Sequence, residues 1–141
     1  MGSKEQEEVS KANKAFYNAF ESLNIKEMEK VWACESTIQC IHPGWGVLRG
    51  WGPVMESWRR IFENTQEMRF VLADVQIEIR DSLAWVNLYE NITSRIGDEV
   101  VTGVVNATNI YEKRPEGWLI IHHHGSTVIQ PTNEPNPSTF H

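Results

Sequence analysis

Cysteine is scarce in this chain of 141 residues, which contains only Cys34 and Cys40. Their spacing is not that of a Cys-x-x-Cys pair, so a zinc or redox motif has no basis in the sequence. Two thiols in a domain of ordinary size are expected to be reduced and structural. The cysteines therefore point to no chemistry of their own.

The sequence also lacks the marks of export, membrane insertion and nucleic-acid binding. The first ten residues are polar, Gln6 stands where a myristoylation signal needs Ser or Thr, and no apolar run approaches a membrane span. The net charge is -6 with both signs interspersed, whereas nucleic-acid-binding domains carry a basic stripe. We therefore expect a cytoplasmic protein with neither a membrane nor a nucleic acid as partner.

Motifs for phosphate binding and nucleophilic catalysis are missing as well. Gly44, Gly46, Gly50 and Gly52 punctuate one connection but lack the Gly-Lys-Ser/Thr ending of a phosphate loop. The serines lack the context of a nucleophile elbow. We expect no cofactor.

Periodicity divides the chain into a helical N-terminal half and a C-terminal half of strands. Apolar residues recur at the helical period in three segments and alternate with polar ones from residue 71 onwards. Helices are predicted at 5–23, 25–33 and 53–64, and strands at 37–42, 71–80, 84–94, 100–111 and 118–124. This segregation indicates the α+β class, a curved antiparallel sheet with three helices on one face around a cone-shaped cavity. We expect one domain in residues 1–126 and a Pro- and Asn-rich tail in 127–141.

The stretch from residue 38 to residue 62 is the richest in candidate functional residues. A short strand ends at His42, breaks at a Pro-Gly pair and leads through a glycine-rich loop into a helix. Trp45, Trp51 and Trp58 follow closely, and their rings either wall a pocket or fill the core. His42 is either the base of that pocket or hydrogen-bonds a loop carbonyl.

Glu90 is a carboxylate on an otherwise apolar strand face. It alternates in step with Ala84, Val86, Leu88 and Ile92. A buried carboxylate must be paired, hydrogen-bonded or protonated. Glu90 is therefore either a pocket acid or base with a raised pKa, or the partner of an arginine or histidine. In the preceding strand, alternation predicts a buried face of Val71, Ala73, Val75, Ile77 and Ile79.

Three adjacent histidines lie in the last strand. His122 and His124 share a face with Ile120, and His123 points to the other side. Two histidines at this spacing can chelate a metal with His42 as a third ligand, but spacing fixes no acidic residue nearby, and we expect no metal site. The alternative is that one histidine faces the cavity while another bonds within the sheet.

Several short segments carry a family resemblance. They are Ile41-His42-Pro43-Gly44, Leu48-Arg49-Gly50 with the tryptophan-bearing helix after it, and Gly117 to Ser126, which closes in His-x-His-x-Ser. In this order they resemble the nuclear transport factor two superfamily, in its SnoaL-like, ketosteroid-isomerase-like branch, over residues 5–126. The resemblance implies a cystatin-like α+β barrel. It does not imply one function, because this fold hosts isomerases, dehydratases, cyclases, binding domains and oligomerisation modules.

The resemblance also extends to single positions. Ketosteroid isomerases place their basic aspartate before a proline at the end of the first strand, and His42 is the matching residue here. Histidine suits that role because its ordinary pKa is about 6.5. The oxyanion-donating tyrosine of those enzymes falls at Phe16, with Tyr17 displaced by about 100° around the helix. This departure argues against steroid isomerisation itself.

Two functions therefore stay open. The first is a cofactor-free enzyme that transfers a proton on a small apolar or aromatic molecule, and the second is a non-catalytic ligand-binding or oligomerisation module. The predicted catalytic residues are His42, Glu90, His122 and His124, and the predicted ligand-binding residues are Trp45, Trp51, Trp58 and Asn106. All of the catalytic set is expected to line one cavity with Trp45 and Trp58.

A homodimer through the outer face of the sheet is also expected. Trp85, Tyr89 and His123 are predicted on faces opposite the helices, and exposed aromatic residues in a row usually meet a partner. The family resemblance implies the same mode of association.

Overall fold

The computed structural model describes residues 2–129, so most of the expected tail, 127–141, lies outside the described residues. The helices are α1 (Gly2–Ser22), α2 (Ile25–Val31) and α3 (Trp51–Glu63). The strands are β1 (Gln39–Ile41), β2 (Leu48–Arg49), β3 (Glu67–Arg80), β4 (Leu83–Ile96), β5 (Glu99–Arg114) and β6 (Gly117–Thr127). Within this range no helix is both long and apolar enough to cross a bilayer.

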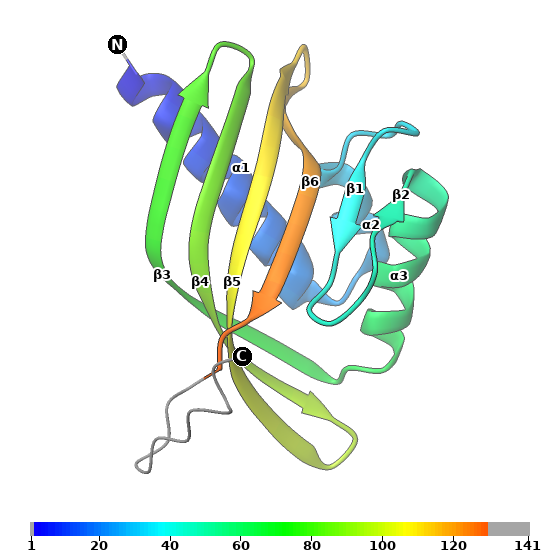
Figure 1. The fold of residues 1–141 in the computed structure, drawn as a ribbon. Coiled ribbons are helices and arrows are strands. Elements are labelled where there is room, and N and C mark those ends of the chain that lie inside the picture. The colour runs from blue at the N-terminus through cyan, green and yellow to red at the C-terminus, as the bar shows by residue number, and fades with distance from the viewer. Residues whose placement is uncertain (1, 130–141) are drawn as a thin grey trace.

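The six strands form one curved sheet in the order β2-β1-β6-β5-β4-β3. The long strands β3 to β6 make an antiparallel meander, but β1 runs parallel to β6, so the sheet is mixed rather than wholly antiparallel. Helix α1 crosses one face of the long strands, and α2 and α3 lie beside the short strands β1 and β2 (Figure 1). The sheet stays open, with β2 and β3 at its edges. The predicted α+β fold with three helices is confirmed.

Aromatic side chains fill the space between the helices and the sheet. Phe16 and Phe20 from α1, Trp58 from α3 and Trp32 after α2 are all at most 8% exposed. Their rings meet edge-on or tilted, with Phe20 and Trp58 centroids 4.7 Å apart. The concave side of the sheet is therefore a packed interior, and polar groups within it must bond to one another.

A bulge divides β3. The register against β4 shifts between residues 73 and 76, and the alternation changes phase there. Leu72 before the bulge and Ile77 after it both turn toward the helices. In a strand without a bulge, residues five positions apart would lie on opposite faces. The predicted burial of Val71 and Val75 is therefore wrong, since these side chains are 69% and 43% exposed.

A second bulge divides β6. Consecutive residues of β5 pair with His122 and Ile120, which leaves Ile121 without a partner. Ile120 before the bulge and His123 after it consequently lie on the same, helix-facing side and are almost fully buried. The predicted burial of His122 and His124 beside Ile120 is wrong, because the extra residue reverses the alternation. For the same reason His123 does not lie on the outer face.

Candidate functional site

Six polar side chains form one hydrogen-bonded network in the interior. None is more than 3% exposed, and α1 and the strands β4, β5 and β6 all contribute. Its members are Asn13, Tyr17, Glu90, Asn109, Tyr111 and His123. The periods of the elements explain the convergence, because residues four apart share one face of a helix and residues two apart share one face of a strand.

The network has a direction. Tyr17 Oη donates to Glu90 Oε2 at 2.5 Å, and Asn109 Nδ2 donates to Tyr17 Oη at 3.2 Å. His123 Nδ1 lies 2.6 Å from Asn109 Oδ1, and since an amide oxygen only accepts, Nδ1 carries the proton. Asn13 Oδ1 accepts from both Asn109 and Tyr111, at 3.0 and 2.8 Å. Donors thus run from His123 through Asn109 and Tyr17 and end at the Glu90 carboxyl.

Burial governs the charge of this network. Loss of hydration raises the pKa of Glu90 to about 7, although the hydrogen bond from Tyr17 opposes the change. Burial also raises the pKa of the Tyr17 hydroxyl, and the neighbouring Glu90 carboxylate raises it further. Burial lowers the pKa of His123 well below its ordinary value. Near neutral pH, Glu90 is the group in the network that titrates.

His42 is fixed just after β1 by Ser57 of α3. Ser57 Oγ donates to the Val54 carbonyl at 2.7 Å, which uses its only proton. His42 Nε2, 2.9 Å from Ser57 Oγ, is therefore the donor in their hydrogen bond. Nδ1 is then the basic nitrogen of the ring. Burial lowers the pKa of His42 to about 4, so the imidazole is neutral at pH 7.

Two tryptophans hold the His42 ring between the surface and the interior. The Trp58 centroid lies 4.7 Å away on the inner side, and the Trp45 centroid lies 4.8 Å away. Trp58 is fully buried whereas Trp45 is 46% exposed. The His123 ring, at the end of the network, is 6.4 Å from the His42 ring. His42 thus lies between the exposed ring of Trp45 and the buried rings of Trp58 and His123.

Trp58 has one further distinguishing feature. Among the described residues its Nε1 is the fully buried side-chain nitrogen without a hydrogen-bond partner. The matching nitrogen of Trp32 lies 3.2 Å from the sulfur of Met28. An unpaired buried donor costs about 1–3 kcal/mol, so the aromatic packing around His42 includes one unfavourable group.

A surface groove begins at Trp45, and we call it the Trp45 groove. It consists of two pockets, of about 440 and about 230 Å³, that share Trp45 and Arg60. The larger one is lined mainly by apolar residues, and the smaller one extends to Ser57. The remaining lining residues are Ile61, Asn64, Thr65, Met68 and Ile96 in the larger pocket, and Leu48, Pro53 and Glu56 in the smaller. The groove therefore reaches Trp45 and Ser57, and both of these side chains contact His42.

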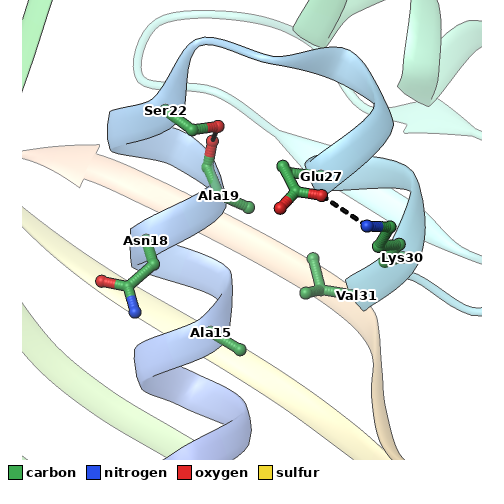
Figure 2. A pocket seen from close by; sticks show the side chains of 7 residues that line it. All are labelled: Ala15, Asn18, Ala19, Ser22, Glu27, Lys30 and Val31. Carbon is green, nitrogen blue, oxygen red and sulfur yellow. Dashed lines mark hydrogen bonds and ion pairs between the residues drawn. The ribbon is translucent and has the colours of Figure 1, made fainter.

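A separate pocket of about 330 Å³ lies between α1 and α2 (Figure 2). Its walls include Ala15 and Ala19 of α1 and Val31 of α2, and its charged residues, Glu27 and Lys30, pair with each other at 2.7 Å. None of the predicted site residues lines it. We assign it no part in the site.

The structure brings together some of the predicted site residues. His42, Trp45 and Trp58 are in ring contact, and Glu90 lies on the buried sheet face as predicted. Glu90 is bonded to Tyr17 rather than to an arginine. Trp51, at the start of α3, packs against the edge of the core and is half-buried.

Three of the predicted residues lie elsewhere. His122 and His124 are on the outer face, where His122 Nδ1 is 3.2 Å from Gln39 Oε1. Asn106 also lies on the outer face and donates to the Leu88 carbonyl at 3.1 Å. Their expected position in the cavity is wrong. Within residues 2–129, no three His, Cys, Asp or Glu side chains are arranged to hold a metal ion.

Sequence reasoning missed five members of the network: Asn13, Tyr17, Asn109, Tyr111 and His123. Asn13 and Tyr17 lie one helical turn apart, beside Phe16 and Phe20, and an asparagine on this apolar helix face was the available signal. Asn109 lies three residues after the predicted Asn106 and therefore on the opposite face of β5. His123 could not be identified by alternation, because the bulge that turns it inward leaves no mark in the residue types.

Comparison with known proteins agrees with this architecture. A SnoaL-like domain is matched over residues 9–130. The structure of a proposed dehydratase of the NTF2-like family from Streptomyces avermitilis is 34% identical with a TM-score of 0.87, over 92% of this chain and 100% of that one. A proposed calcium/calmodulin-dependent protein kinase type II association domain from Thiobacillus denitrificans is 30% identical with a TM-score of 0.72, over 84% and 93%.

One relative is much longer than this chain. The F-box protein SKIP8 of Arabidopsis thaliana is 25% identical over 123 residues, which are 86% of this chain and 50% of that protein. The chain thus spans about half the length of this relative. From the extent of the domain match and the similarity to the Streptomyces protein, the chain belongs to the SnoaL-like family within the NTF2-like superfamily.

Proposed function

We propose that the protein binds a small apolar or aromatic molecule and transfers a proton on it without a cofactor, as isomerases, dehydratases and cyclases do. The observation that carries this proposal is the burial of both His42 and Glu90, which inverts the usual order of their pKa values. In water a glutamate ionises well below a histidine, but here burial raises the pKa of Glu90 to about 7 and lowers the pKa of His42 to about 4. Between these values Glu90 is a protonated acid while His42 is an unprotonated base.

The chemistry divides between these groups. His42 Nδ1 takes a proton from the carbon next to a carbonyl group. The protonated carboxyl of Glu90 donates a hydrogen bond or a proton to the carbonyl oxygen, where negative charge develops, and the aromatic packing must open for the ligand to reach it. Return of the proton to another carbon completes an isomerisation, and loss of hydroxide from the neighbouring carbon completes a dehydration. The hydrogen bond to Ser57 keeps the basic nitrogen in one tautomer.

Entry of the ligand requires Trp45 to move, because His42 is only 3% exposed. Trp45 is flanked by Gly44 and Gly46, and both glycines have open space where a side chain would lie. Since glycine is conformationally permissive, we expect the backbone on both sides of Trp45 to allow the indole to turn aside. A flat apolar ring that takes its place would keep the contact with the imidazole, which favours an aromatic ligand.

The experiment is deuterium exchange of the methyl protons of acetophenone in D₂O, followed by NMR between the two pKa values. The wild-type protein should accelerate exchange over buffer. His42→Gln should remove the acceleration, because the Gln amide can still donate to Ser57 but provides no base. Glu78→Gln, at an exposed residue paired with Arg80, should behave as wild type. A wild-type rate equal to that of buffer would overturn the catalytic proposal.

We propose homodimerisation through the outer sheet face as a second function. It is supported by large apolar side chains left exposed on that face, among them Val71 at 69% and Trp85 and Tyr89 at 37% each. The name of the Thiobacillus relative, an association domain, is consistent with assembly. The packed interior also suits a module that needs no cavity. The cytoplasmic location stays a prediction from the sequence.

A further inference from the structure

Arg60 is the cation that the two pockets of the Trp45 groove share. Among residues 2–129 no ion pair of Arg60 is found, whereas the adjacent Arg59 pairs with Glu56 at 3.6 Å and lines a different pocket, beside Phe62. A free guanidinium in a concave site is a ready donor to a planar anion.

Apart from Arg60, Asn64 and Thr65, the residues that line the larger pocket are apolar. Trp45 and Ile96 are two of the most exposed large hydrophobic residues near the helices, at 46% and 48%, and both line this pocket with Met68 and Ile61. Its volume of about 440 Å³ lies within the range of about 300–1,000 Å³ that small-molecule sites occupy. A flat apolar body with one anionic group would cover these surfaces and neutralise Arg60.

We propose that the Trp45 groove binds a small aromatic carboxylic acid, whose carboxylate pairs with Arg60 while its ring packs on Trp45. This inference deepens the proposed function and rests on it, because the acid would be the molecule presented to His42. The smaller pocket brings the ligand to Ser57, whose hydroxyl is bonded to His42. The carboxylate fixes the end of the ligand that stays at the surface.

Glu56 weakens the attraction of the Trp45 groove for a carboxylate. It also lines the smaller pocket, one helical turn before Arg60, and its charge opposes an anion there. Its pairing with Arg59 reduces that opposition without removing it, since both side chains are about half exposed. Replacing Glu56 should therefore strengthen the binding of the acid and leave the binding of a neutral ligand unchanged.

The test compares cinnamate with cinnamamide, which has the same shape and no charge, in titrations of ¹⁵N-labelled protein. We expect both ligands to shift the Trp45 indole resonance, assigned with Trp45→Phe. Cinnamate should bind about threefold to tenfold more tightly, as befits a solvent-exposed ion pair. Arg60→Gln should abolish this preference and Glu56→Gln should increase it. Arg59→Gln should keep the preference but reduce it, because the Glu56 carboxylate then loses its partner. Higher salt should weaken only the binding of cinnamate.

Three results would overturn the inference: equal affinity of the wild type for the two ligands, a preference retained in Arg60→Gln, or saturable binding that leaves the Trp45 resonance unmoved. The acetophenone experiment separates this failure from that of the proposed function. Acetophenone is neutral, so its exchange by wild type but not by His42→Gln would stand even if cinnamate showed no preference. Conversely, an Arg60-dependent preference would stand as a binding site if no exchange were seen.

Discussion

Glu90 is a buried carboxyl whose ionisation should be visible in the stability of the fold. Its pKa is raised from an ordinary 4.5 to about 7, so the folded state holds a proton that the unfolded chain releases. The stabilising contribution is therefore complete below pH 4.5 and is lost as the pH rises through 7.

Glu90→Gln should remove this pH dependence, because Gln can accept the Tyr17 hydrogen bond but does not ionise. Between the two pKa values the loss in wild type should reach about 3 kcal/mol in the free energy of unfolding. Urea unfolding at a series of pH values measures it, with Glu78→Gln as the control. Parallel pH profiles for wild type and Glu90→Gln would contradict the pKa assigned to Glu90.

The hydrogen bond from Tyr17 holds the Glu90 pKa below the value that burial alone would give. Tyr17→Phe should therefore raise the pKa of Glu90 further. It should also cost about 1–3 kcal/mol of stability, because the Glu90 carboxyl and the Asn109 amide both lose a buried partner. The pKa is read from the carboxyl ¹³C shift of Glu90. Tyr89→Phe, an exposed change on the outer sheet face, should leave that shift curve in place.

The pH–rate profile of acetophenone exchange is expected to be bell-shaped because it depends on both His42 and Glu90. Acceleration of acetophenone exchange requires His42 to be unprotonated and Glu90 to be protonated, so the rate should rise through about pH 4 and fall through about pH 7. In Tyr17→Phe the fall should move to higher pH while the rise stays in place. A profile that increases steadily through neutral pH would show that an unprotonated Glu90 is the active form.

At the scale of elements, Gly125 is where β6 meets the segment that carries His42. A Cβ at this position would lie 3.1 Å from Val105 Cγ1 and 3.3 Å from Pro43 Cδ, closer than normal contacts. Gly125→Ala should therefore destabilise the fold by about 1–3 kcal/mol and displace the loop that follows His42. Gly103→Ala is the matched control, since Gly103 lies in β5 with open space at its Cβ position. Thermal unfolding of both variants tests this, and equal melting temperatures would contradict the close packing.

Burial was predicted correctly from the sequence in strands without a bulge and only partly in strands that contain one. In β4 the alternation is unbroken, and the burial of Glu90 was predicted correctly together with that of its apolar neighbours. In β3 and β6 a single bulge reverses the phase, so residues were assigned correctly on one side of it and wrongly on the other. Helical periods have no such discontinuity here, and the three helices were found close to their observed bounds.

The contacts of the site were less predictable than its location. The ring contacts of His42 with Trp45 and Trp58 join residues close in sequence, and the stretch that carries them was identified. The bonds of Tyr17 to Glu90 and of Asn13 to Asn109 join residues more than seventy positions apart. Such pairings depend on how α1 lies across the sheet, and no local pattern encodes that placement.

At the scale of the whole molecule, the proposed association through the outer sheet face can be tested by the oligomeric state. If the face is a dimer interface, sedimentation velocity at micromolar concentration should give the mass of two chains, and Trp85→Arg should shift it to one. Lys30→Ala, on the helical side of the molecule, should have no effect. A wild-type monomer under these conditions would contradict the proposal and leave the exposed Trp85 and Tyr89 unexplained.

The bulge at Ile121 has a consequence for the tolerance of this fold to error. Asn109 requires an imidazole opposite it, and His123 supplies one. Because both neighbours of His123 are also histidines, a slip of the end of β6 by one residue in either direction would present another imidazole at the same place. The three adjacent histidines thus allow the hydrogen bond to Asn109 to form in any of three registers of β6. An insertion or deletion near the bulge would therefore keep an imidazole opposite Asn109, although it would also move Gly125 away from its close contact with Val105 and Pro43.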